Sequence, residues 1–223
     1  MKKVIILLLA ALVCAAFAHP FAVKSAELLG NDQVEVSTIL GTGFVEGSDI
    51  AIENDLTYGA GERFNITISN LWTVNNVDEK DRGFGAPVIG TRFGLIPDVL
   101  AIDAHSAING GTWGGDLIYT LALESETKFN FNIGFANDGD DVFTYGFAFI
   151  QPINSMFIGA ELFGKAFDGM SDDEVVGENT FWNFGLGYNL SDTKTLSLGL
   201  GGDFDSNSAL RLSLGFTFVL GGN

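Results

Sequence analysis

The sequence predicts an all-β protein: a transmembrane up-and-down antiparallel β-barrel of about twelve strands, with ten or fourteen strands as the alternatives. Three observations lead to this prediction. Apolar residues recur with a period of two, the periodic segments are long, and short and long connections alternate along the chain. Period two indicates strands with one apolar face. Tilted strands that cross a bilayer need about nine to eleven residues, whereas soluble strands average about five or six.

The chain begins with a predicted signal peptide, residues 1–18. Lys2 and Lys3 precede an apolar run, and Ala16-Phe17-Ala18 forms a small-x-small cleavage site. Residues 19–32 are expected to be a periplasmic N-terminal segment, residues 33–220 the transmembrane β-barrel, and residues 221–223 a C-terminal tail. The single cysteine lies within the signal, so the exported chain is expected to have no disulfide.

Charge and composition narrow the function. The chain has 28 acidic and 11 basic residues and a formal net charge of −17, which argues against a nucleic-acid partner. It is nevertheless 47% hydrophobic and contains 29 glycines. After the signal, no run of eighteen apolar residues occurs, which excludes a transmembrane helix. The apolar and acidic characters must therefore be segregated between the faces of strands and the loops.

The predicted strands alternate apolar and small or polar residues. One of the clearest places Phe129, Phe131, Ile133 and Phe135 on one face. The last strand, in the C-terminal LRLSLGFTFVLGGN, alternates in the same way, although Phe218 rather than the final residue is its last aromatic. In chain order the predicted strands are 33–44, 49–58, 63–74, 88–96, 99–107, 116–124, 128–136, 141–150, 155–165, 180–190, 194–202 and 209–220.

The connections sort by length. Short links fall at 59–62, 97–98, 125–127, 151–154 and 191–193, and the intervening links are mostly longer and acidic. This alternation is typical of a barrel with tight periplasmic turns at one rim and longer outward loops at the other. A soluble exported β-sandwich remains the alternative, because its strands also carry one apolar face.

Charged residues on the polar face of the strands are candidates for lining the lumen. On the lipid face a charge costs roughly 2–4 kcal/mol near the midplane for Arg or Lys, so these residues are expected to point inward. This arrangement favours a narrow pore or a ligand-holding lumen over a lumen plugged by its own paired charges. The lumen-lining candidates are Glu53, Asp55, Arg92, Asp103, His105, Glu124, Glu161, Lys165 and Arg211.

No catalytic, cofactor-binding or metal site is expected, and the chain is not expected to be an enzyme. His105 and Ser106 are adjacent, but consecutive strand residues point to opposite faces, so they cannot form a Ser–His pair. The spacing Asp203-x-Asp205-x-Asn207 resembles the start of a calcium loop but lacks its glycine and its bidentate glutamate. It is therefore expected to be an exposed turn.

Two stretches resemble a known family. They are FTYGFAFIQPINSMFIGAELFGK (143–165) and ENTFWNFGLGYNLSDTKTLSLGLG (178–201). They are similar to the bacterial outer-membrane β-barrel proteins associated with the meta-pathway of phenol degradation. The resemblance implies a porin-like channel in the Gram-negative outer membrane for small solutes, including hydrophobic ones. The implied partners are outer-membrane lipid and lipopolysaccharide, the outer-membrane insertion machinery and a small-molecule solute, with no cofactor.

Overall fold

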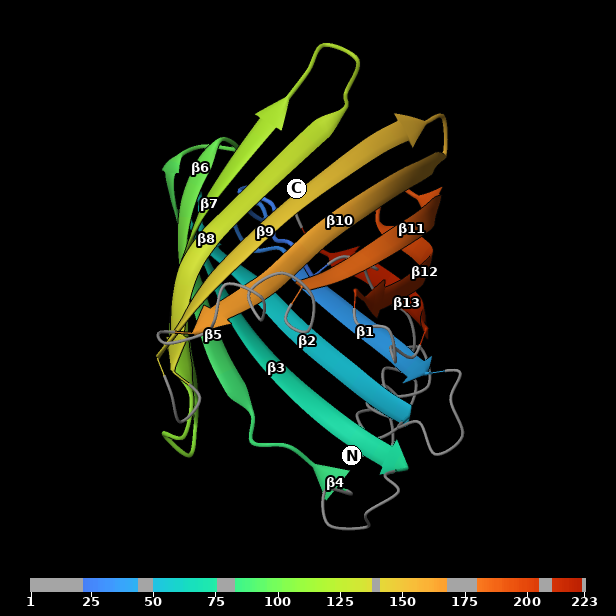
Figure 1. The fold of residues 1–223 in the computed structure, drawn as a ribbon. Coiled ribbons are helices and arrows are strands. Elements are labelled where there is room, and N and C mark those ends of the chain that lie inside the picture. The colour runs from blue at the N-terminus through green and yellow to red at the C-terminus, as the bar shows by residue number, and fades with distance from the viewer. Residues whose placement is uncertain are drawn as a thin grey trace, which may run out of the picture.

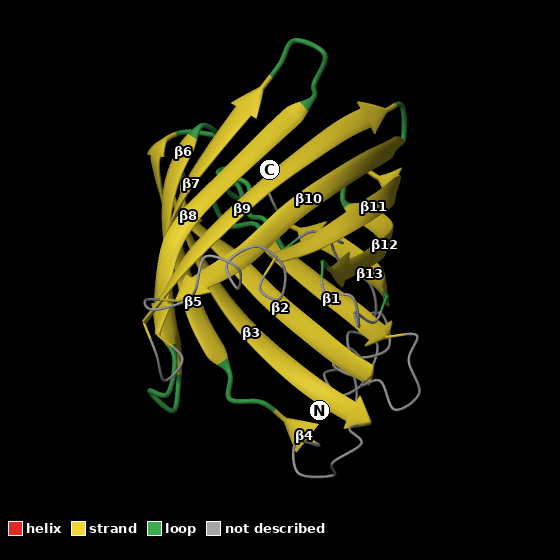
Figure 2. Ribbon diagram, in the orientation of Figure 1, coloured by secondary structure: helices red, strands yellow, loops and turns green. Residues whose placement is uncertain are grey.

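The computed structural model describes residues 22–43, 50–75, 83–137, 141–167, 180–204 and 210–221. Within these ranges every regular element is a β-strand (Figures 1 and 2), and no helix is long and apolar enough to cross a membrane. The strands are β1 (Val34–Gly43), β2 (Ile50–Gly61), β3 (Phe64–Asn75), β4 (Gly83–Phe84), β5 (Val88–Ile96), β6 (Leu100–Ala107), β7 (Trp113–Ala122), β8 (Lys128–Asn137), β9 (Asp141–Ile153), β10 (Met156–Phe167), β11 (Thr180–Ser191), β12 (Lys194–Asp203) and β13 (Arg211–Leu220).

The sheet closes on itself. β1 pairs antiparallel with β13 along its whole length, from Val34 opposite Leu220 to Gly43 opposite Arg211. The two-residue β4 pairs only with the end of β3, so the closed circuit contains twelve strands. Figure 1 shows the strands tilted around a single barrel. The β-sandwich alternative is therefore wrong, because a sandwich needs two separate sheets.

The twelve strands of the circuit are those predicted from the sequence, with ends that differ by up to three residues. The largest difference at a strand start is β7, which begins at Trp113 rather than at Asp116 because its ladder with β6 extends through Gly114 and Trp113. β7 also ends at Ala122, before Glu124. β4 was not predicted, because a two-residue strand is too short to show any period.

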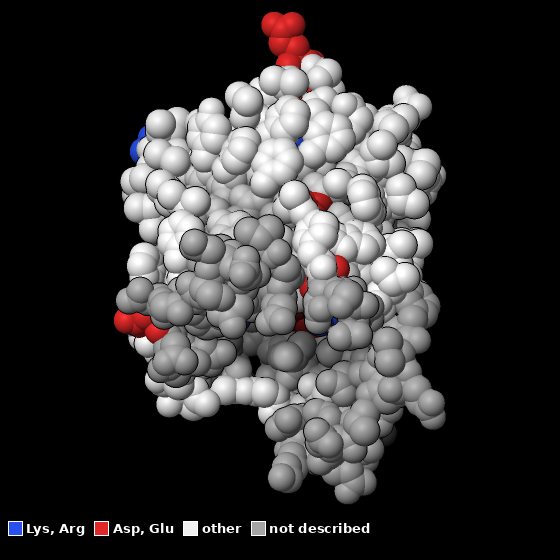
Figure 3. All heavy atoms as spheres, viewed as in Figure 1, with Lys and Arg blue, Asp and Glu red and all other residues white. Residues whose placement is uncertain are grey.

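The two faces of the wall differ in character. On the outer face of β8, Phe131, Ile133 and Phe135 are 41%, 51% and 58% exposed. Neighbouring outer rows bring aromatic rings together, as in Phe131 with Phe147 at 5.2 Å between ring centroids. Figure 3 shows few charged side chains on this wall, and those that are visible lie at its edges or in recesses. A belt of this kind is what a barrel presents to acyl chains.

The turns at one rim are tight. Asp98, Glu126 and Asn154 each adopt a positive φ, between 56° and 63°, in the connections β5–β6, β7–β8 and β9–β10. Asn and Asp tolerate this left-handed conformation better than most residues do. The strand ends at the opposite rim are joined mostly by the ranges 44–49, 76–82, 138–140, 168–179 and 205–209, which lie outside the described residues.

The N-terminal segment enters the barrel. Its described part, residues 22–33, lies against the inner face of the barrel and not outside the rim. At the short-turn rim the Asp32 N–H donates to the Gly59 carbonyl oxygen and the Gly59 N–H donates to the Gln33 carbonyl oxygen, both at 2.9 Å. From there the segment runs inward to Ala22, whose N–H reaches Glu161 in β10. Its backbone lies in the lumen because inward polar side chains satisfy the N–H and C=O groups that no strand pairs.

Candidate functional site: the lumen and its N-terminal segment

The strand register fixes which predicted residues face the lumen. Arg92 pairs with Asp103, Asp103 pairs with Asp116, and Ala148 pairs with Glu161, so these side chains share the face opposite the aromatic belt. Of the nine candidates, eight lie on inward rows: Glu53, Asp55, Arg92, Asp103, His105, Glu161, Lys165 and Arg211.

Glu124 does not line the lumen. It follows the end of β7 and lies exposed in the turn before β8. The prediction extended the alternation of β7 past its real end, where the turn begins.

The inner end of the segment is fixed by a carboxylate cluster. The Lys24 ammonium donates to Asp103 Oδ1 at 2.8 Å and to Asp116 Oδ2 at 2.9 Å. Arg92 Nε lies 3.5 Å from the other Asp103 oxygen, and His105 Nδ1 lies 3.3 Å from Asp103 Oδ1. Two carboxylates on adjacent strands thus face two cations, one from the wall and one from the segment.

Glu161 fixes the segment a second time. Its two carboxylate oxygens accept the N–H groups of Ala22 at 2.9 Å and Val23 at 2.8 Å, and Asn183 Nδ2 donates to it at 3.2 Å. Glu161 is only 3% exposed. Hydrogen bonds to an ionised acceptor are stronger than neutral ones, so this carboxylate holds the backbone at the inner end of the segment.

Neutral side chains hold the backbone of the segment at Lys24 and Ala26. The Ala26 N–H donates to Thr120 Oγ1 at 2.8 Å, and Thr120 in turn donates to Asn130 Oδ1 at 2.9 Å. With its amide oriented to satisfy both bonds, Asn132 donates to the Lys24 carbonyl oxygen at 2.9 Å and accepts the Lys24 N–H at 3.0 Å. Side chains on the inner wall of β7 and β8 therefore hydrogen-bond to the backbone of the segment, as the backbone of a neighbouring strand would.

Aromatic and cationic side chains lie on the inward rows of β10, β11 and β13. Phe163 stacks on Phe181 with ring centroids 5.4 Å apart, and the Arg211 guanidinium carbon lies 5.5 Å from the Phe181 ring centroid. The neighbouring inward positions of β11 and β12 include Gly185, Gly187, Gly199 and Gly201. Side chains thus fill the two halves of the inner wall unequally.

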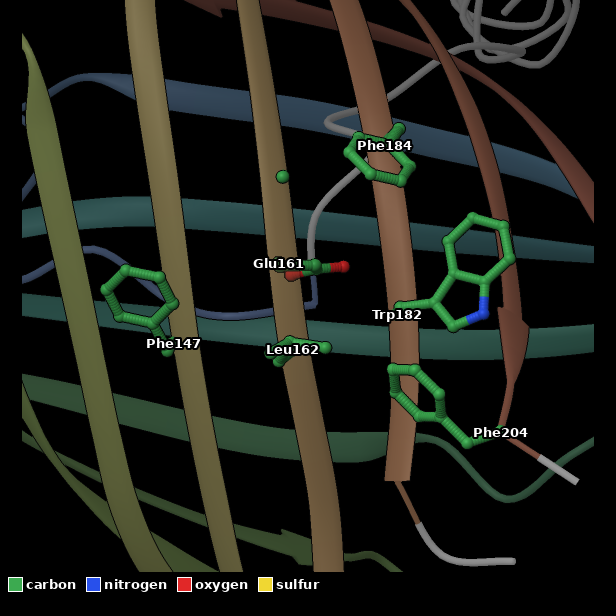
Figure 4. Close-up of a pocket in the computed structure, with 7 residues that line it drawn as sticks. Phe147, Glu161, Leu162, Trp182, Phe184 and Phe204 are labelled. Carbon is green, nitrogen blue, oxygen red and sulfur yellow. The ribbon is translucent and has the colours of Figure 1, made fainter. Parts of the chain in front are cut away.

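A hollow of about 450 Å³ is lined mainly by apolar residues of the outer face. Phe147, Leu162, Trp182 and Phe184 come from adjacent strands and line it, with Phe204 beside Trp182 (Figure 4). Phe147, Leu162, Trp182 and Phe184 lie on the outer rows of β9, β10 and β11, and Glu161, which also lines the hollow, lies on the inward row of β10. The hollow is therefore a groove in the outer apolar belt that extends to Glu161.

Other candidates from the sequence carry no site. His105 pairs with Gly114 on the inner face and Ser106 with Trp113 on the outer face, as their positions in the strand predicted. The signal peptide and the acidic stretches around 138–140, 171–174 and 205–207 lie outside the described residues.

Asp103, His105 and Asp116 can offer ligand atoms within 4.8 Å of one another, a group not anticipated as a metal site. Asp116 was missed although the alternation of its strand places it inward. Lys24 could not be identified from the sequence as a lumen residue, because a segment that is not a strand shows no regular alternation of apolar and polar residues.

No protein-family model and no curated protein matches the sequence. Solved structures are similar in fold. The COG4313 outer membrane channel from Pseudomonas putida F1 aligns with a TM-score of 0.57 at 13% identity, over 87% of this chain and 98% of that one. The KdgM porin, in complex with disordered oligogalacturonate, aligns with a TM-score of 0.60 at 11% identity, over 83% and 98%. The NanC porin gives a TM-score of 0.60 at 13% identity over the same shares. This chain shares the closed β-barrel fold of these outer-membrane channels and porins.

Proposed function

We propose that the chain is an outer-membrane channel for small hydrated solutes, in which residues 22–33 narrow the passage. The observation that carries the proposal is the contrast across one wall, apolar outside and charged inside, in a sheet without free edges. Lipid surrounds such a barrel, because all its backbone groups pair within the protein. Insertion would require the outer-membrane insertion machinery, and the acidic long loops would lie beside lipopolysaccharide.

The charges favour some solutes over others. The inward carboxylates Asp103, Asp116, Glu161, Glu53 and Asp55 are accompanied by inward Arg92, Lys165 and Arg211 and by Lys24 of the segment, whereas the whole chain carries a formal charge of −17. A channel built from a chain with this excess of acidic residues attracts cations and repels anions. An acidic oligosaccharide such as that in the KdgM complex is therefore a poor candidate for this chain. The hydrophobic solutes implied by the phenol-degradation resemblance would find no advantage in a charged wall.

The test is reconstitution of the exported chain in planar bilayers and in liposomes. We expect discrete conductance steps and flux of small neutral solutes, together with detergent extraction from the outer-membrane fraction and heat-modifiable gel mobility. A folded, membrane-inserted barrel with no conductance and no flux would leave only a structural role and would refute the channel.

A further inference from the structure

We propose that Asp103, Asp116 and His105 form a subsite for a small primary ammonium group, and that Lys24 is its tethered occupant. This inference rests on the proposed function and specifies it, because it names the class of solute that the channel recognises. A solute amine and Lys24 of the N-terminal segment would then compete for the same two carboxylates. Binding of the solute therefore loosens the segment that narrows the passage.

This subsite of Asp103, Asp116 and His105, called the niche below, already holds an ammonium group with suitable geometry. The Lys24 nitrogen makes two charge-assisted hydrogen bonds, at 2.8 and 2.9 Å, to carboxylates on adjacent strands. Thr144 Oγ1 donates to the remaining oxygen of Asp116 at 3.2 Å, which orients that carboxylate. A free primary amine has the same donors as lysine, so the wall would hold it in the same way.

Two glycines on neighbouring inward positions make room for the niche. A Cβ at Gly114 would lie 2.7 Å from His105 Nε2, and a Cβ at Gly134 would collide with Asp116 Oδ1. Both side chains can lean along the wall only because these positions carry no side chain. The site is therefore shaped by the sheet and not by the segment alone.

The charges around the niche favour a cation. Asp103 and Asp116 carry two negative charges, and Arg92, with its Nε 3.5 Å from Asp103, supplies one positive charge. Glu35 and Asp55 add negative charge near Arg92 and Lys24, so the surroundings favour a cation. The N–H donors of an ammonium group match the two carboxylates that hold the Lys24 nitrogen at 2.8 and 2.9 Å.

Solvent reaches the niche. The side chains of Lys24 and His105 are 31% and 32% exposed, whereas those of Asp103 and Asp116 are 9% and 15% exposed. The carboxylates are thus shielded while the ammonium and the imidazole are accessible. Lys24 also lies near the inner end of the described segment, whose other end is fixed at the short-turn rim.

Competition with a tethered group sets the scale of the effect. A group on a short flexible tether has an effective concentration in about the millimolar range, so a solute amine must approach that concentration to displace Lys24. In the unmodified protein the apparent affinity for the solute amine is the intrinsic affinity multiplied by the fraction of molecules in which Lys24 has left the niche. If that fraction is about 1%, the apparent affinity is about 100-fold lower. Removal of the Lys24 side chain abolishes the competition.

The experiment compares the full exported chain with Lys24→Ala in detergent micelles, by calorimetric titration with ethylammonium chloride. We expect saturable binding to Lys24→Ala that is at least about tenfold tighter than to the unmodified protein. Lys128→Ala is the matched control, because it removes another lysine that pairs with the segment, through Glu27 at 2.6 Å, and leaves the niche occupied. Tetramethylammonium, which has the charge but no N–H donor, should not bind, and Lys24→Ala/Asp103→Asn should lose binding.

Several results would overturn the proposal. They are absence of ethylammonium binding by a folded, heat-modifiable Lys24→Ala barrel, equal binding after Asp103→Asn, and binding of Zn²⁺ that is tighter than that of the amine. If Lys24→Ala fails to fold, ethylammonium should still raise the conductance of the unmodified channel in a saturable way, and no change there would equally refute the site. Calorimetry needs no flux, so amine binding without conductance would refute the channel alone. Conductance without amine binding would refute the subsite alone.

Discussion

Glu161 is the residue whose charge holds the inner end of the segment most directly. Its carboxylate accepts the N–H groups of Ala22 and Val23, and an amide in its place would turn an NH₂ group toward one of these donors. A hydrogen bond to a charged group contributes about 1.5–3 kcal/mol. Glu161→Gln should therefore raise the fraction of channels with a released segment by roughly 10- to 100-fold.

Single-channel recording of Glu161→Gln measures this effect as a higher open probability or mean conductance. Glu124→Gln is the matched control, because Glu124 lies exposed in a turn and should leave the recordings unchanged. If the two variants behave alike, Glu161 does not hold the segment.

Two inward glycines differ in the space around them, and this difference predicts how alanine at each position changes the free energy of unfolding. A Cβ at Gly187 would collide with the Phe157 ring, which is 9% exposed and packs over this position, whereas a Cβ at Gly41 would meet nothing within 4 Å. Gly187→Ala should lower the free energy of unfolding by about 1–3 kcal/mol through overpacking. Gly41→Ala should be neutral or stabilise by up to about 1 kcal/mol, because glycine is unfavourable within a strand.

Urea unfolding in detergent, followed by the heat-modifiable gel shift, compares these variants with the unmodified protein. Equal stability of the two alanine variants would contradict the packing of Phe157 over Gly187.

At the scale of elements, each strand is stable in the bilayer because its outer row is apolar. Leu198 lies mid-strand in β12 and Leu190 lies near the end of β11, and they are 42% and 53% exposed. Leu198→Arg should destabilise the inserted barrel by about 2–4 kcal/mol and Leu190→Arg by about 0–1 kcal/mol, because the cost of a lipid-facing charge falls toward the interface.

Unfolding from lipid vesicles measures both arginine variants. Equal small costs at the two depths would show that the outer rows do not contact acyl chains.

The N-terminal segment is the element whose contacts the sequence did not show. It was expected at the periplasmic side because an even number of strands places both chain ends at the short-turn rim. Apolar and polar residues do not alternate regularly in this segment. Its backbone is bound by Thr120, Asn132 and Glu161 on β7, β8 and β10. Contacts of this kind depend on strands far away in the chain, so no local pattern could have shown them.

For the whole molecule, the sign of the charge predicts ion selectivity. The acidic excess of the chain and the inward carboxylates should make the channel prefer cations. In a potassium chloride gradient the reversal potential should therefore have the sign of cation selectivity, and its magnitude should fall as salt screens the charges. An anion-selective reversal potential would contradict both this prediction and the ammonium subsite.

The sequence by itself determined the class of fold, the twelve strands of the circuit and the inward face of eight of the nine predicted lumen residues, all but Glu124. It could do so because lipid and water sort side chains residue by residue, and the alternation of Phe129, Phe131 and Ile133 records that sorting locally. Only the tertiary structure decided which inward residues meet. Asp103 and Asp116 lie on adjacent strands, but Lys24 reaches them from 79 and 92 positions earlier in the chain. Closure of the barrel forms the lumen, and the polar groups of its inner wall hold the segment inside by hydrogen bonds and ion pairs.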